Sequence, residues 1–162
     1  MSAVLSDDRL LRFRLDRTVA TGGPTYAFFG INPSTADEDV DDATVRKWIG
    51  FTKVLGGRGF IVGNVFPYRT KDVKKLVDTP EEATSLNHAY LRVIAHEADI
   101  LIPCWGNTTK VSKTLEDSFY DVVNVLQSTG KPMWTFGYTK SGDPLHPLML
   151  GYDTALQPWI YQ

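Results

Sequence analysis

The chain has 162 residues, a formal net charge of −2 and 43% hydrophobic residues, which is the composition of an ordinary globular protein. Its single cysteine, Cys104, excludes a disulfide framework, and no apolar run approaches the roughly 20 residues that span a bilayer. Residues 1–17 alternate charged residues with leucine and contain no signal-peptide core. We therefore expect one domain over residues 1–162, a cytoplasmic location and no membrane partner.

Apolar runs and helical stretches alternate along the chain. Continuous apolar runs are typical of strands buried on both faces, as in a parallel sheet, and they occur at residues 26–31, 60–65, 100–104 and 133–136. Apolar residues at helical spacing lie between them, at 42–55, 81–96 and 111–127. This order predicts an α/β three-layer sandwich with a central, mostly parallel four-stranded sheet. Its ligand site should lie beyond the carboxyl ends of the strands.

The first expected strand ends in Gly30-Ile31-Asn32-Pro33-Ser34. A glycine lets the backbone approach a ligand, and the proline stiffens the turn that follows, so Asn32 is held just past the strand. An amide at this place can orient a water molecule or a polar ligand edge. The alternative is an ordinary Asn-Pro turn in which Ser34 caps the next segment.

The second expected strand ends in Asn64, inside an otherwise apolar run. A buried amide needs hydrogen-bond partners, and its paired donor and acceptor suit the edge of a nucleobase. Phe66 or Tyr68 would supply a stacking face, and Arg69 would meet phosphate. The alternatives are that Asn64 ties down a neighbouring loop and that Arg69 pairs with a surface acid.

The last two expected strands lead to a tryptophan and a histidine. Trp105 follows the third strand and is either a core residue or a pocket wall, whereas Cys104 is interpreted as a small buried hydrophobe. His146 lies in a loop rich in turn formers after the fourth strand. A histidine there can donate to a developing negative charge or act as a general acid, unless it only bonds to backbone.

Positive and negative charges gather in two different segments. Residues 46–75 contain eight basic residues and one acid, so a basic segment that could meet phosphate exists within a weakly acidic chain. Solvated helix faces and turn ends are the alternative. Residues 37–42 contain five acids, but their spacing is not that of an EF-hand. We expect a solvated loop in which Asp41 or Asp42 favours the start of the next helix, rather than a metal site.

Taken together, these motifs resemble the domain-of-unknown-function 1643 family. The resemblance covers most of the chain from about residue 10. It is carried by Asn32-Pro33-Ser34-Thr35-Ala36-Asp37, Asp41-Asp42, Thr44, Arg46, Gly50-Phe51, Asn64-Val65-Phe66, Tyr68-Arg69-Thr70, Trp105-Gly106, Thr139-Lys140-Ser141-Gly142, His146-Pro147-Leu148 and Gln157-Pro158-Trp159.

A second resemblance, to the uracil-DNA glycosylase superfamily, implies a uracil-DNA-glycosylase-like fold and an activity. Gly30-Ile31-Asn32-Pro33 is similar to the first motif of the mismatch-specific branch, whose third residue positions water. Asn64 falls where the superfamily has a base-reading asparagine, and Trp105-Gly106 resembles its Leu-Leu-Trp-Gly segment. His146-Pro147 resembles its His-Pro-Ser motif, whose histidine faces the base carbonyl. Leu148 replaces the serine, and no aspartate occupies the Asn32 position.

The resulting hypothesis is an N-glycosidase that acts on a damaged or modified pyrimidine in DNA or in a nucleotide, without a cofactor or metal. Asn64 would read the base, His146 would stabilise the leaving anion, and Asn32 would position water, with Asp41 or Asp42 in reserve. The remaining substrate contacts would come from Gly30, Ser34, Phe66, Tyr68, Arg69, Trp105 and Lys140, and phosphate contacts from Arg46 and Lys47.

Two other functions fit the same residues. A non-catalytic module that binds a modified base or nucleotide would need no activating aspartate. A metal-dependent nucleotide hydrolase or a base-modifying transferase would use Asp37, Asp41 and Asp42. Release of free base and sensitivity to chelators separate these alternatives from the glycosidase.

Overall fold

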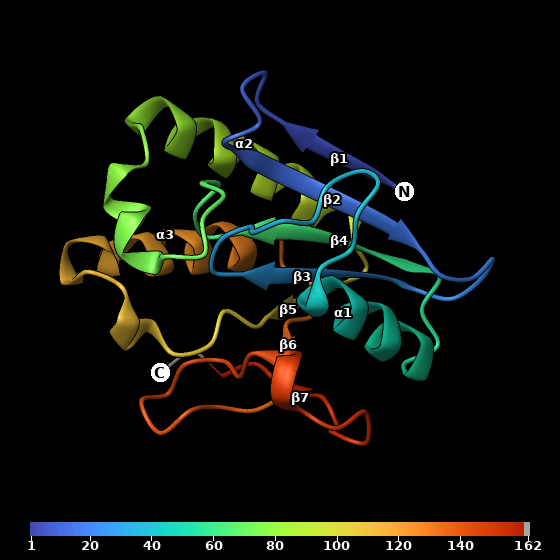
Figure 1. The fold of residues 1–162 in the computed structure, drawn as a ribbon. Helices are drawn as coiled ribbons and strands as arrows, with labels where there is room; N and C mark the ends of the chain where they lie inside the picture. The colour runs from blue at the N-terminus through green and yellow to red at the C-terminus, as the bar shows by residue number, and fades with distance from the viewer. Residues whose placement is uncertain (161–162) are drawn as a thin grey trace.

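The computed structural model describes residues 1–160 and contains a central five-stranded sheet with helices on both faces (Figure 1). In order across the sheet, the strands are β1 (Ser2–Leu5), β2 (Arg12–Thr18), β4 (Gly59–Asn64), β3 (Thr25–Gly30) and β5 (Ile100–Pro103). β3 runs parallel to both β4 and β5, whereas β2 is antiparallel to β1 and β4. The α-helices are α1 (Ala43–Val54), α2 (Glu81–Glu97) and α3 (Glu116–Gln127).

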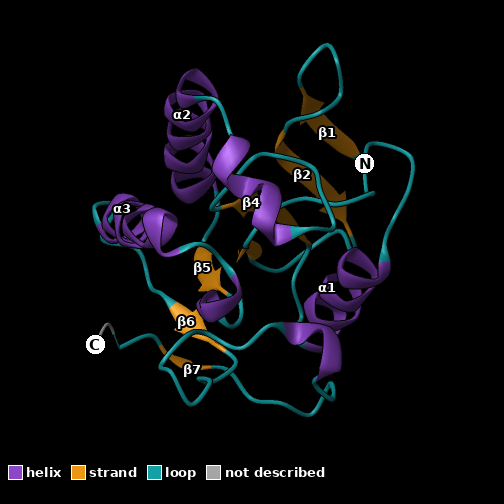
Figure 2. Cartoon of the chain, turned by 60° about the vertical axis from the view of Figure 1, so that its left-hand side comes forward, coloured by secondary structure: helices purple, strands orange, loops and turns teal. Residues whose placement is uncertain are grey.

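The parallel strands are buried on both faces, which explains their continuous apolar sequence. Alternate side chains of a strand point to opposite faces of the sheet. Phe28, Phe60 and Ile102 therefore pack in one core cluster with α1, while Phe29, Ile61 and Leu101 pack in another with α2 and α3. Figure 2 shows α2 and α3 on one side of the strands and α1 on the other. The α/β architecture and the three parallel strands are thus as the sequence predicts.

The number of strands in the sheet differs from the expectation of four. β1 and β2 join the sheet as antiparallel strands, and the sequence gives no continuous apolar run there because charged and apolar residues alternate in Arg12–Thr18. The expected strand at 133–136 does not form a strand of the five-stranded sheet: its backbone pairs with β5 at a bridge between Met133 and Leu101, while Phe136 packs on Phe28 of β3. Its remainder, β6 (Trp134–Thr135), pairs instead with β7 (Gln157–Pro158) near the C-terminus.

The carboxyl ends of β3, β4 and β5 meet at one edge of the sheet, where three loops are held together by backbone hydrogen bonds. The N–H of Val65 donates to the carbonyl of Gly30, and the N–H of Cys104 donates to that of Phe29. The loop after β5 is joined to the loop before His146, because the N–H of Gly106 donates to the carbonyl of Pro144 at 2.8 Å. None of the helices within residues 1–160 combines the length and apolar character that crossing a bilayer requires.

Candidate functional site

A small pocket lies at this edge of the sheet, and we call it the inner pocket. Its volume is about 60 Å³, several times the roughly 10–15 Å³ that one water molecule needs. It brings together six residues that the sequence analysis singled out, Gly30, Asn32, Ser34, Asp42, Asn64 and His146. Arg12 and Trp48 complete its polar and aromatic walls together with Ile31, Pro33, Thr44 and Val45. Of the residues expected at the ligand site, the first strand end, Asn64 and His146 line this pocket, whereas Phe66, Tyr68, Arg69 and Trp105 do not.

Asn64 presents an unused hydrogen-bond donor at this pocket. It is the last residue of β4 and shares a sheet face with Phe60 and Val62, so its side chain lies on the α1 side. The residue is 2% exposed, and its amide nitrogen Nδ2 has no partner among the described residues. A Cβ atom at Gly30 would lie 2.9 Å from Asn64 Oδ1, so only glycine at position 30 leaves the amide this room.

The backbone at Asn64 is fixed from the opposite face of the sheet. Asn87 of α2 is 1% exposed, and its Nδ2 donates to the carbonyls of Asn64 and Val65 at 2.9 and 3.2 Å. Asn87 therefore has the loop-holding role that the sequence analysis weighed for Asn64. The side chain of Asn64 is left to face the pocket.

His146 contributes a second donor. Its Nδ1 accepts a hydrogen bond from the N–H of Leu148 at 3.2 Å, where it begins the short 3-10 helix Pro147–Met149. Burial lowers the pKa of His146 below its usual value of 6.5, and the charge of Asp42 opposes this only in part. The imidazole is therefore neutral at pH 7. Because Nδ1 is an acceptor, the proton is on Nε2, which can donate to a ligand.

Asn32 is held in place by its amide nitrogen. Nδ2 donates to the carbonyls of Pro33, Tyr68 and Thr70 at 3.1, 3.2 and 2.7 Å, so the loop after β3 is tied to the loop after β4. No hydrogen bond to Asn32 Oδ1 is found within residues 1–160. Asn32 can therefore serve both expected roles with different atoms. Its Nδ2 ties the two loops together, and its Oδ1 remains as an acceptor for a water molecule.

The carboxylates of the acidic loop turn to separate partners. Asp42 Oδ1 caps α1 by accepting from the N–H of Val45 at 2.9 Å. Asp41 pairs with Arg17 at 2.7 Å, and Asp37 accepts from the backbone of Asp39 and Val40. The described part of the chain contains no group of three or more His, Cys, Asp or Glu side chains placed to hold a metal ion.

Arg12 is the pocket residue that sequence reasoning missed. It is 2% exposed, its NH1 donates to the carbonyl of Ala36 at 2.9 Å, and its Nε is buried without a partner among the described residues. Burial lowers its pKa to about 10, an effect that nearby Asp42 opposes, so the guanidinium remains charged at pH 7. An arginine in an alternating strand usually faces water, and nothing in the sequence distinguishes this one.

An open groove of about 470 Å³ continues from the inner pocket, and we call it the outer groove. The two share Ser34, Asp42 and Thr44. The groove lies at the N-terminal end of α1, and its two cationic side chains are Arg46 and Lys71. Arg46 NH1 donates to the carbonyl of Asp41 at 2.6 Å. Lys71 belongs to the basic segment, although the sequence analysis did not select it.

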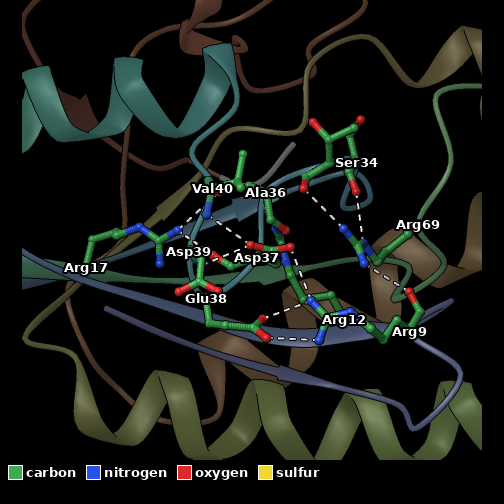
Figure 3. A network of polar contacts seen from close by, with 11 residues as sticks. Arg9, Arg12, Arg17, Ser34, Ala36, Asp37, Glu38, Asp39, Val40 and Arg69 are labelled. Atoms are coloured by element: carbon green, nitrogen blue, oxygen red, sulfur yellow. Dashed lines mark hydrogen bonds and ion pairs between the residues drawn. The ribbon is translucent and has the colours of Figure 1, made fainter.

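Four arginines enclose the loop between β3 and α1, as Figure 3 shows. Arg9 pairs with the carboxylates of Asp37 and Glu38, and Arg17 donates to the carbonyls of Asp37 and Val40. Arg69 uses Nε, NH1 and NH2 for the carbonyls of Ser34, Arg9 and Thr35 at 3.0 to 3.1 Å. The expected phosphate contact Arg69 therefore holds the loop that forms the wall of the site.

Arg69→Ala is expected to destabilise the protein by about 1–3 kcal/mol, because three backbone carbonyls of two loops lose their donor. Chemical denaturation with the free energy of unfolding as readout measures this loss. The exposed Arg58 makes one such bond, from Nε to the carbonyl of Gly23, so Arg58→Ala is the matched control with a smaller loss. Equal stability of wild type and Arg69→Ala would contradict the loop-holding role.

Several predicted site residues lie outside the inner pocket. Phe66 and Trp105 belong to the core cluster with α2 and α3, where both contact Phe119, and Tyr68 packs against it. Trp105 also lines a separate cavity with Trp159. The ammonium of Lys47 lies 4.3 Å from the ring centre of Tyr152. Lys140 is exposed and lines neither the pocket nor the groove.

The comparison with protein families agrees with the motifs. Residues 12–148 match the family described as "Protein of unknown function (DUF1643)". The chain belongs to the DUF1643 family. The match includes every residue that lines the inner pocket and the outer groove. No curated protein and no solved structure matches the chain.

Proposed function

We propose that this DUF1643 protein binds a pyrimidine-type nucleobase in the inner pocket and hydrolyses its N-glycosidic bond, with a damaged or modified base in DNA or in a nucleotide as substrate. The observation that carries the proposal is that one pocket is lined by Asn64, whose Nδ2 has no partner among the described residues, by His146, whose Nδ1 is an acceptor, and by Asn32. Two donors and an acceptor, fixed at strand ends, match the needs of a base that must be read and then released as an anion.

Hydrolysis of the N-glycosidic bond would use each of these side chains at a different atom of the substrate or of the water. Water attacks the anomeric carbon of the sugar, and the bond from that carbon to the base nitrogen breaks. The bonding electron pair leaves with the base and spreads to its exocyclic carbonyl oxygens, where Asn64 and His146 donate hydrogen bonds. Asn32 Oδ1 accepts from the attacking water. Asp42 is the carboxylate in the pocket that can take the water proton, and the free base regains a proton from solvent.

The motif order supports the same proposal. Gly30-Ile31-Asn32-Pro33, Asn64, Trp105-Gly106 and His146-Pro147 occur in the order of the uracil-DNA glycosylase superfamily, and three of these four motifs contribute to the inner pocket. The likeness rests on these short motifs alone. Trp105 stays in the core, so the reading of the base is assigned to polar groups rather than to stacking on that ring.

The direct test is release of free base, measured by chromatography after incubation with pyrimidine nucleosides, nucleotides and short single- and double-stranded DNA that contain uracil or oxidised pyrimidines. We expect release that persists in the presence of a chelator. Release abolished by a chelator would favour the metal-dependent alternative on Asp37, Asp41 and Asp42. No release from any of these substrates would contradict the glycosidase.

One observation favours a binding module as the second candidate. Asp41 pairs with Arg17, and Asp42 uses its Oδ1 to cap α1, so neither carboxylate is wholly free to act as a general base. A site without a free general base can hold a base without cleaving it. Tight binding of a nucleoside that is recovered intact would support this candidate.

The outer groove predicts that phosphate adds to affinity. Arg46 and Lys71 lie where a phosphate attached to a base in the inner pocket would reach the start of α1. The double variant Arg46→Ala, Lys71→Ala is expected to weaken nucleotide binding about tenfold and nucleoside binding little. Titrations at low and high salt should show a shallower salt dependence for this variant. Lys110→Ala, which changes an exposed lysine outside the groove, is the control. Identical nucleotide affinity in all three proteins would exclude this phosphate subsite.

A further inference from the structure

We propose that the inner pocket binds its ligand through an oxygen that carries negative charge, and that Arg12 is the residue that neutralises this charge. The ligand class is an anionic heterocycle, either a base that is acidic when free or the base anion formed on bond cleavage. This inference rests on the proposed function in that it places the base in the inner pocket, but it does not require cleavage of the N-glycosidic bond.

Arg12 is buried without an ion-pair partner. The residue is 2% exposed, and no carboxylate of the described residues lies within 4 Å of its guanidinium nitrogens. Its one hydrogen bond is to the carbonyl of Ala36, while Nε bonds to nothing described. A buried charge without a partner is costly, so such groups are retained where a ligand completes their hydrogen bonds.

Two arginines near the pocket form no ion pair among the described residues. The charged groups near Arg12 include Arg17, Arg69, Asp37 and Asp42. Arg17 is paired with Asp41, and Arg9 is shared by Asp37 and Glu38. Arg12 and Arg69 have no such carboxylate partner, so an anionic ligand in the pocket could supply one to Arg12.

Besides Arg12 Nε, the pocket has two buried donors without a partner among the described residues, Asn64 Nδ2 and Trp48 Nε1. Asn64 Nδ2 is buried and unpaired at the same pocket, so Arg12 and Asn64 from neighbouring strands β2 and β4 both offer N–H groups without acceptors. Donors outnumber acceptors among these orphaned groups. A water oxygen can accept from two of them, but an oxygen with negative charge is a stronger acceptor, because charge-assisted hydrogen bonds are about twice as strong as neutral ones.

The test compares two sugar-free pyrimidine rings by isothermal titration calorimetry at neutral pH. Barbiturate is an anion with three exocyclic oxygens, and uracil is neutral with two. We expect wild type to bind barbiturate about tenfold or more tightly than uracil. Arg12→Met should abolish this preference, whereas Arg12→Lys should retain part of it. Arg58→Met, which removes an exposed arginine elsewhere, should leave it unchanged.

A second variant keeps the test decisive where Arg12→Met fails to fold. Asn64→Asp preserves shape but places a carboxylate in the pocket, so barbiturate binding should be lost while uracil binding is reduced less. Equal binding of both rings by wild type, or no binding of barbiturate, would overturn the inference. Base release with no preference for the anionic ring would support the glycosidase activity and overturn the role of Arg12 in anion binding. Preferred binding of barbiturate without base release would support the role of Arg12 and contradict the glycosidase activity.

Discussion

Replacement of His146 by alanine is expected to lower the rate constant for base release by about 100- to 1000-fold, with a much smaller effect on substrate binding. The reason is that negative charge appears on the base only as the bond breaks, so a donor fixed beside it stabilises the transition state more than the ground state. Single-turnover kinetics separate the two effects, since they give the rate constant for cleavage and the dissociation constant independently.

Two controls separate this role from a structural one. His96 is exposed on α2, so His96→Ala should leave both constants unchanged. The pH dependence supplies the second control. A proton on Nδ1 would break the bond from Leu148 N–H, and burial holds the pKa of His146 below 6.5. Activity should therefore be retained at neutral pH, where the imidazole is neutral, and fall as the pH drops through this lowered pKa. Equal losses in binding and rate, or full activity of folded His146→Ala, would remove His146 from the mechanism.

The parallel part of the fold was predictable because its signal is local. Tyr26–Gly30, Phe60–Asn64 and Ile100–Pro103 are apolar on both faces, so a continuous run identifies each strand without knowledge of its neighbours. The end of each apolar run also marks the end of its strand, so the sequence places Asn32 just after β3 and Asn64 at the end of β4. β1 and β2 lack this signal, because alternating charged residues also occur in solvated segments. β2 enters the sheet by pairing with β4 across 41 to 47 positions, as between Leu15 and Val62, with Leu15 at 0% exposure, and β1 enters by pairing with β2.

Side-chain partners were less predictable than strand ends, because they come from distant loops. Arg69 was expected to meet phosphate, but its three carbonyl acceptors include Ser34 and Thr35, which lie 35 and 34 positions away. Phe66 follows β4 by two residues, yet it turns to the core cluster of α3 rather than to the pocket. Arg12 shows the reverse error, since a residue with the sequence context of a surface strand lies buried at the centre of the site.

Asn64→Ala is expected to reduce discrimination between bases by roughly 10- to 100-fold, because a paired amide contact to a base edge contributes about 1–3 kcal/mol. The measurement is the ratio of kcat/KM for substrates that differ only in the base. For the binding module, it is the ratio of the two dissociation constants. The preferred base should lose most, and the others little, so the variant approaches a common low level for all of them.

The free energy of unfolding distinguishes base reading from a structural role of Asn64. Asn87 provides the comparison, because it contacts the backbone at the same strand end. Asn64 Nδ2 bonds to nothing described, so its removal should leave the free energy of unfolding nearly unchanged. Asn87 Nδ2 holds two carbonyls, so Asn87→Ala should cost about 1–3 kcal/mol. If Asn64→Ala instead destabilised the protein as much as Asn87→Ala and kept its base preference, Asn64 would be a structural residue. Base reading would then have to be assigned to other donors of the pocket, first of all to Arg12.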